Sequence, residues 1–350
     1  MKRISFLLIL TAVLFVVVTC GDDNPVQPQD TPDEHLFYIA PMAGNMVRVF
    51  SVEREMFIDS MIIDSVGTAD TMRLHVIGDD SLLAVSLKTK TFIYDLSERQ
   101  IISTFEAYKP TFSRNSQYYY SMGSVKTFPG HVELFHQPGG SVEGKFCNRS
   151  EVVSFVYFPN SDTANLVIYN VLGHSSGYSI KKIGNYVLHL HLMLCSPFPS
   201  NSLNKTFLSI GCQYSATDFF SDTVRILRWD GFGSGATHII SPDERFSFYT
   251  DVGQKVWGFV PTGYLYVYDA ADEDSLAAIP FQGLNMADLL VISSDGKYLL
   301  VRERYEYMFG ENRIFNVIDI HNLAVVGAYD CGFMLGSISS KYCAANGLSY

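Results

Sequence analysis

Short apolar runs recur along the chain, and most of them end in a polar residue or a turn. Runs in which apolar and polar residues alternate are frequent after residue 34, whereas the helical spacing i, i+3, i+4, i+7 is not sustained over three turns there. Phe (25 residues) and Tyr (21 residues) are abundant, and clusters of Gly, Asn, Asp and Ser separate the runs. The pattern predicts an all-β fold.

Seven similar segments mark an internal repeat. They are 47–52, 91–96, 131–137, 178–184, 224–230, 264–270 and 313–320. Aligned on Ser51, Asp95, His136, Lys182, Asp230, Asp269 and Asp319, they lie 39 to 50 residues apart. A period of about 40 to 50 residues is typical of β-propeller blades. An apolar strand precedes each segment and another follows it, so we expect a seven-bladed β-propeller over 35–350. Each segment would be the third strand of a four-stranded antiparallel blade.

The two ends of the repeat array indicate how the ring closes. The first unit begins at its second strand, 35–41, with no inner strand before it. The last unit is followed by one more strand-like segment, 332–346. We expect this C-terminal strand to join the first blade and close the ring, which removes exposed sheet edges. Because 178–184 is the weakest of the seven segments, counts of six and eight blades stay open.

Two segments carry a resemblance to a known group of propellers. SSDGKYLLV (293–301) and NVIDI (316–320) resemble hairpins of the YVTN, lactonase and quinoprotein-dehydrogenase-like (WD40-like) propellers. The resemblance implies the blade pattern, but no catalytic residue of that group maps onto this chain. Asp295-Gly296 predicts a tight turn with positive φ at the glycine. We expect the aspartates at strand ends to cap the turns that follow them: Asp95, Asp230, Asp269 and Asp319.

The N-terminus has the three-part build of an export signal. Lys2 and Arg3 precede an apolar run over 4–18, and Cys20 follows. Residues 17–21 resemble the lipobox of bacterial lipoproteins, although Thr19 stands where that family has Gly, Ala or Ser. The resemblance implies a signal peptide over 1–19 and lipidation (palmitate) at Cys20. An ordinary signal peptide is the alternative. Residues 20–34, rich in acidic residues and proline, predict a flexible tether.

Charge narrows the classes of partner. The chain carries 36 acidic and 25 basic residues, a formal charge of −11, so its surface repels phosphate backbones and nucleic acid is excluded as an expected partner. We expect a monomeric domain in the bacterial cell envelope, on its periplasmic or extracellular face, that meets the membrane only through its lipid.

Candidate chemistry is sparse. Motifs for a catalytic serine, a zinc protease, a phosphate loop or a haem are absent from the sequence. His189 and His191 lie two residues apart, so in a strand they share a face and could both bind one metal; two half-buried core histidines are the alternative. No cofactor is predicted, and a metal at this pair is the one alternative.

Charged and aromatic residues also cluster near 302–307, and the cysteines allow two bridges. Arg302, Arg304, Tyr305 and Tyr307 form either a solvated loop or a binding rim. Export permits the disulfides Cys331–Cys343, which would staple the closure, and Cys195–Cys212. Free thiols are the alternative.

Two classes of function fit these observations. In the first, the chain is a membrane-tethered propeller that acts as a binding or scaffolding module for a protein or glycan of the cell envelope. In the second, it is an enzyme or sensor that uses the central channel for a small molecule or a metal, such as a lactonase-like hydrolase or a quinoprotein. The fold alone cannot decide between them, because propellers host unrelated activities. We favour the first, because no catalytic set is visible and aromatic residues are plentiful for contact surfaces.

Overall fold

The computed structural model divides the chain into two units, Met1–Glu34 and His35–Tyr350. The expected signal peptide and almost all of the tether, with Cys20, lie outside the described residues. The structure describes residues 34–78, 81–137, 140–147, 151–160, 163–172, 178–185, 195–200, 202–210, 213–218, 225–229, 238–250, 264–280, 286–293, 295–304 and 313–340.

The described residues of the second unit form seven four-stranded antiparallel sheets, here called blades 1 to 7. Blade 1 consists of β28 (Leu335–Ser339), β1 (Leu36–Pro41), β2 (Met46–Ser51) and β3 (Met56–Ile62). Blade 2 consists of β4 (Arg73–Ile77), β5 (Leu82–Ser86), β6 (Lys90–Asp95) and β7 (Gln100–Glu106). Blade 3 consists of β8 (Thr111–Phe112), β9 (Tyr118–Ser121), β10 (Ser124–Thr127) and β11 (Glu133–His136).

The other four blades follow the same order from the inner to the outer strand. Blade 4 has β12 (Gly140–Phe146), β13 (Val152–Asn160), β14 (Thr163–Asn170) and β15 (Tyr178–Asn185). Blade 5 has β16 (Cys195–Ser200), β17 (Lys205–Ile210), β18 (Gln213–Asp218) and β19 (Arg225–Trp229). Blade 6 has β20 (His238–Ile240), β21 (Phe246–Thr250), β22 (Tyr264–Asp269) and β23 (Ser275–Pro280). Blade 7 has β24 (Met286–Ile292), β25 (Tyr298–Arg304), β26 (Ile314–Asp319) and β27 (Ala324–Asp330).

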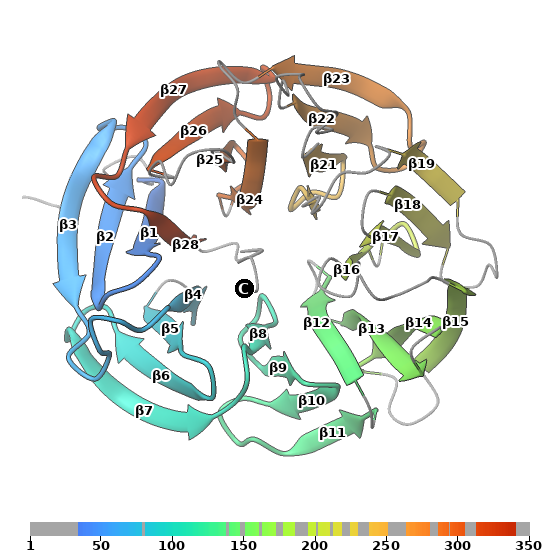
Figure 1. The fold of residues 1–350 in the computed structure, drawn as a ribbon, viewed down its shortest axis with the longest axis horizontal. Coiled ribbons are helices and arrows are strands. Elements are labelled where there is room, and N and C mark those ends of the chain that lie inside the picture. The colour runs from blue at the N-terminus through green and yellow to red at the C-terminus, as the bar shows by residue number, and fades with distance from the viewer. Residues whose placement is uncertain are drawn as a thin grey trace, which may run out of the picture. The chain divides into compact units, whose positions relative to one another are not determined.

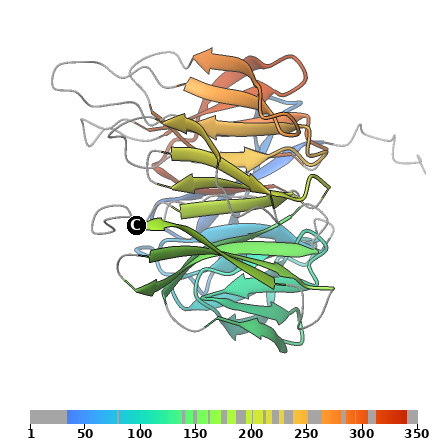
Figure 2. The same ribbon diagram turned by 90° about the vertical axis from the view of Figure 1, so that its right-hand side faces the viewer.

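The blades are arranged around a common axis (Figure 1). Their inner strands contact one another in the order β28, β4, β8, β12, β16, β20 and β24, and β24 in turn contacts β28. Seen from the side, the strands run between two opposite faces, where the turns gather (Figure 2). Among the described connections, the first face carries those from the second to the third strand of a blade and from one blade to the next. The second face carries the other described turns.

The C-terminal strand is integrated into blade 1, as the ends of the repeat array led us to expect. β28 pairs antiparallel with β1. It also bonds the neighbouring blade, because the Leu74 amide donates to Ser337 Oγ (3.1 Å) and the Val76 amide donates to Ser339 Oγ (2.9 Å). The buried serines therefore satisfy amides on the free edge of β4, which would otherwise be costly to bury.

Side chains of opposite faces pack against different neighbouring blades. In β5, Leu83 and Val85 belong to the cluster between blades 1 and 2, whereas Ala84 belongs to the cluster between blades 2 and 3. Blades 7 and 1 meet through the rings of Phe50 and Phe315, whose centroids lie 5.0 Å apart. Because both faces of β5 are buried, this strand is a nearly continuous apolar run (LLAVS).

The predicted phase of the repeat is wrong in three blades. Segments 131–137, 178–184 and 224–230 contain β11, β15 and β19, which are outermost strands and not third strands. The third strand was placed correctly in blades 1, 2, 6 and 7. A shift by one strand escapes the pattern because neighbouring strands in a blade have similar apolar and polar spacing.

The predicted turn chemistry is confirmed where it can be seen. Asp95, Asp269 and Asp319 each accept hydrogen bonds at Oδ1 from two amides of the following turn, at 2.8 to 3.0 Å. Gly296 has a φ of 75°. Asp230 lies outside the described residues. These aspartates therefore have a structural role.

Candidate functional site: a basic cavity at the ring closure

A cavity of about 370 Å³ lies on the first face of the ring, where blades 7, 1 and 2 meet. It is lined by Met42, Ala69, Asp70, Thr71, Met72, Arg73, Ser86, Leu87, Lys88, Tyr108, Lys109, Arg302, Gly336 and Ser337. Several of these residues are exposed, so the cavity opens to solvent. Its volume is within the range of small-molecule sites.

The lining is strongly basic. Its described residues include four cationic side chains and one acidic one, on a chain whose net charge is −11. Arg73 and Arg302 lie deep, with exposed fractions of 8 % and 3 %, whereas Lys88 is exposed and Lys109 is half-buried. The one carboxylate, Asp70, accepts a hydrogen bond from the amide of a residue three positions before it and so caps its own turn. A cleft lined by one sign of charge concentrates ligands of the opposite sign.

The closure strand β28 forms the floor of the cavity. Arg302 Nη1 donates to the Leu335 carbonyl (2.6 Å), which fixes this guanidinium against the strand. At Gly336, an added Cβ would lie 2.5 Å from the Pro41 carbonyl oxygen and 2.6 Å from Met42 Cα, so only glycine allows this approach. The floor thus exists only when the N- and C-terminal strands are paired.

One rim of the cavity is held by a serine of the next blade. The hydroxyl of Ser121 accepts from the Tyr108 amide (3.1 Å) and donates to the Tyr108 carbonyl (2.9 Å). The ammonium of Lys109 lies 5.6 Å from the centre of the Tyr108 ring. An exposed aromatic ring with a fixed backbone therefore borders the basic lining.

Positive charge continues from the cavity toward the centre of the ring. Burial, and then the charges of Arg73 and Lys145, hold the pKa of His75 well below its usual range. Burial and the charge of Lys145 lower the pKa of His238 to about 3. Both histidines are therefore neutral near pH 7, and the cationic groups of this region are Arg73 and Lys145.

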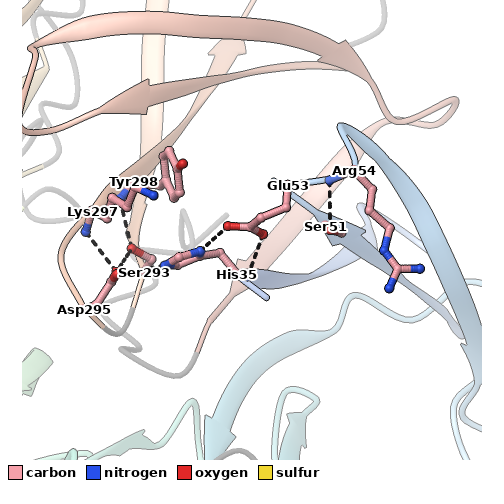
Figure 3. Close-up of polar contacts among 8 residues, drawn as sticks. All are labelled: His35, Ser51, Glu53, Arg54, Ser293, Asp295, Lys297 and Tyr298. Carbon is pink, nitrogen blue, oxygen red and sulfur yellow. Dashed lines mark hydrogen bonds and ion pairs between the residues drawn. The ribbon is translucent and has the colours of Figure 1, made fainter. Parts of the chain in front are cut away.

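A second polar cluster lies on the other face, at the junction of blades 1 and 7 (Figure 3). The ring of His35 contacts two carboxylates: its Nδ1 faces Glu53, and its Nε2 lies 2.8 Å from Asp295 Oδ2. The His35 amide also donates to Glu53 (2.8 Å), and its ring packs edge-on against Tyr298 at 4.9 Å. Asp295 belongs to the turn between β24 and β25, so His35 joins the first strand of the domain to the last blade.

The pKa values in this cluster shift in opposite directions. Burial alone would lower the pKa of His35, but its hydrogen bonds to Asp295 and Glu53 outweigh burial and raise it. Burial alone would raise the pKa values of Glu53 and Asp295, and the bonds to His35 and to backbone amides lower them. The geometry is that of an ion-paired clamp across the ring closure.

Arg302 is the sequence-predicted rim residue that the structure places at the cavity. It lies buried in β25, so the expectation of a solvated loop is wrong at this position. Arg304 ends the same strand, while Tyr305 and Tyr307 lie outside the described residues. His189 and His191 also lie outside them, and the residues that the structure describes contain no group of three His, Cys, Asp or Glu suited to a metal.

The structure describes only some of the cysteines in the two predicted disulfides. Cys331 is a buried thiol whose Sγ donates to the carbonyls of Arg313 and Phe333 (2.9 Å each). Its expected partner, Cys343, lies outside the described residues, as does Cys212, and the structure describes only the backbone of Cys195. Both bridges stay predictions.

Three of the four basic lining residues escaped the sequence analysis. Arg73, Lys88 and Lys109 lie 193 to 229 residues before Arg302 in the sequence, and only the closed ring brings them together. One signal was available: β4, an inner strand, begins with a charged residue and carries a histidine two positions later on the same face.

Comparison with solved structures finds proteins with a similar fold. Apo AztD from Citrobacter koseri matches with a TM-score of 0.56 and 9 % identity, over 87 % of this chain and 97 % of that one. Dihydro-heme d1 dehydrogenase NirN in complex with DHE matches with a TM-score of 0.54 and 11 % identity, over 88 % and 75 %. The β-propeller domain of Cps50 (Swd1) from Myceliophteria thermophila gives 0.52 and 11 %, over 76 % and 88 %. The chain has a β-propeller fold.

At these identities the matches show a shared fold alone. No protein-family model matches the chain, and no curated protein matches it. Within the part of the chain that the structure describes, no helix is long and apolar enough to cross a membrane.

Proposed function

We propose that this propeller is an exported, lipid-tethered binding module of the bacterial cell envelope, and that its basic cavity binds an anionic group of the ligand. The observation that carries the proposal is the set of four cationic side chains around one cavity on an acidic protein. Such a site attracts anions from solution and fixes them by charge-assisted hydrogen bonds.

The position of the domain's first residue supports the tethered arrangement. His35 lies at the start of β1, on the face opposite the cavity mouth. The domain therefore begins on the face away from the cavity, so a chain that enters it at His35 leaves the cavity mouth accessible. The export signal and the lipobox-like residues 17–21 support the anchor itself.

Binding is tested by thermal shift and calorimetry on the purified full-length chain with phosphate, sulfate, citrate and glucuronate, and with neutral glucose as the reference. A ligand at about ten times its Kd should raise Tm by about 2 °C. Reversing both rim charges, Lys88→Glu with Lys109→Glu, should abolish the shift. Lys90→Glu is the matched control, because this exposed lysine lies outside the lining. Equal responses to glucose and to every anion would contradict the proposal.

The anchor is tested separately by labelling cells with a palmitate analogue. The wild-type chain should carry the label and stay with the membrane fraction, whereas Cys20→Ser should lose both properties. A Cys20→Ser protein that keeps the label would contradict lipidation at this residue.

A further inference from the structure

We infer that the occupant of the basic cavity is an acidic sugar, a pyranose that carries a carboxylate, phosphate or sulfate group. This inference rests on the proposed function, because it assumes that the cavity binds anions. It adds the class of molecule to which the anion belongs.

The depth of the two guanidiniums gives the position of the anionic group. Arg73 and Arg302 are almost fully buried, and Arg302 is fixed by its bond to the Leu335 carbonyl. β28 bonds both sides of the floor, since its Ser337 accepts from the Leu74 amide beside Arg73 and its Leu335 carbonyl accepts from Arg302. An arginine presents planar donors that match the oxygens of a carboxylate, phosphate or sulfate. The acidic group of the ligand therefore binds at the floor.

The rim offers a surface for the body of the ligand. Tyr108 is exposed, and Ser121 fixes its backbone on both sides. One face of a pyranose presents C–H groups, which pack against an aromatic ring. Aromatic side chains provide this contact with little loss of rotamer freedom. A bare inorganic anion has no apolar face to pack against the Tyr108 ring.

Hydroxyl groups along the wall suit a polyol. The residues with hydroxyl groups that line the cavity are Thr71, Ser86 and Ser337. Ser337 Oγ already accepts a hydrogen bond from the Leu74 amide, so the hydroxyl proton of Ser337 points away from that amide. Serine and threonine hydroxyls both donate and accept, so they pair with sugar hydroxyls. The cavity volume of about 370 Å³ is at the low end for small-molecule sites, which suits a sugar unit or the end of an acidic glycan.

The test compares matched ligands on the purified full-length chain by calorimetry. Glucuronate, glucose 6-phosphate and glucose 6-sulfate represent acidic sugars and distinguish the three acidic groups. Glucose lacks the charge, and inorganic phosphate, sulfate and citrate lack the ring. We expect at least one acidic sugar to bind about tenfold more tightly than glucose and than the matching free anion.

Variants at the rim separate the ring contact from the charge. Tyr108→Ala should lower the affinity for the acidic sugar about fivefold to tenfold and change the affinity for inorganic phosphate by no more than about twofold. Tyr108→Phe should bind both ligands as tightly as the wild type does. Lys109→Glu should weaken both the sugar and the free anion by about fivefold. Tyr108 is exposed, so neither substitution at that position should unfold the protein.

The outcomes separate the two proposals. The acidic-sugar inference would be overturned if free anions bound as tightly as the acidic sugars and Tyr108→Ala lowered neither affinity. The anion site would then still be supported. If no anion and no acidic sugar bound the wild type, or if Lys88→Glu and Lys109→Glu left their binding unchanged, the proposed function itself would be overturned.

Discussion

Replacing His35 with glutamine should make the stability of the propeller depend less on pH. In the wild type, protonated His35 bonds Glu53 and Asp295 across the junction of blades 1 and 7 (Figure 3). Glutamine keeps one polar contact at a time but never carries the charge. The decrease in the free energy of unfolding therefore measures the charge-assisted part of the clamp.

The magnitude follows from the exposure of the three side chains. His35 is 12 % exposed, but Glu53 and Asp295 are 30 % and 48 % exposed, so solvent screens both pairs. A screened pair contributes up to about 1 kcal/mol, which gives about 1 to 2 kcal/mol for the clamp. For a domain of this size the corresponding fall in Tm is about 2 to 3 °C.

The direction of each shift defines the pH range. The raised pKa of His35 gives stability that is fully present below about pH 6.5, its unfolded value, and is lost as pH rises through the folded pKa. The lowered pKa values of Glu53 and Asp295 give stability that is present above about pH 4.5 and is lost as pH falls through their folded values. The clamp should be complete between these limits.

The assay is a thermal melt of the full-length wild type and His35→Gln at pH 6 and at pH 9. We expect the difference in Tm to be largest at pH 6 and to shrink toward pH 9, because the pair with protonated His35 is lost as pH rises through its raised pKa. His321→Gln is the control, because His321 is exposed in the turn after β26. A difference that is equal at the two pH values, or matched by the control, would refute the ion-paired clamp.

Three further predictions concern the closure. Gly336→Ala should cost about 1 to 3 kcal/mol and lower Tm by about 2 to 5 °C, because its Cβ meets the backbone of Pro41 and Met42; Gly130→Ala, with ordinary contacts, should change Tm little. Removing residues 335–350 should abolish the folded state in circular dichroism, because β1 loses its partner and buried Leu335 and Ile338 are deleted. Burial raises the pKa of the Cys331 thiol, so this residue should be alkylated at least about tenfold more slowly in the native protein than in denaturant. Equal rates of alkylation would contradict its burial. An intact-mass comparison with and without reductant tests the Cys331–Cys343 bridge.

The sequence predicted the features of the fold that local chemistry controls. The aspartates after β6, β22 and β26 cap their turns, and the glycine of the 293–301 hairpin has the positive φ that its turn requires. The absence of an inner strand before 35–41 pointed to β28. Each of these signals lies within a few residues or at the ends of the repeat array.

The phase of three blades and most of the cavity could not be predicted in this way. A strand that packs between two blades has the same pattern whether it is third or fourth, so 131–137 was misplaced. Arg302 was expected in a loop because charged residues follow it, but its guanidinium is satisfied by a carbonyl of β28. That carbonyl is 33 residues away in sequence, and no local pattern reports such a contact.

The closure strand connects the two polar clusters on the opposite faces of the ring. β28 forms the floor of the basic cavity and also bonds blades 2 and 1, while His35 joins blade 1 to blade 7 on the other face. A ligand in the cavity would contact residues from blades 7, 1 and 2 at once, so its binding energy adds to the stability of the closure. The same ligand should therefore restore part of the Tm that His35→Gln loses, although it binds on the other face. The effect needs no residue that belongs to both clusters, because a ligand that binds only the folded protein stabilises it as a whole; the described residues of the cavity lining and of the His35 clamp have no member in common.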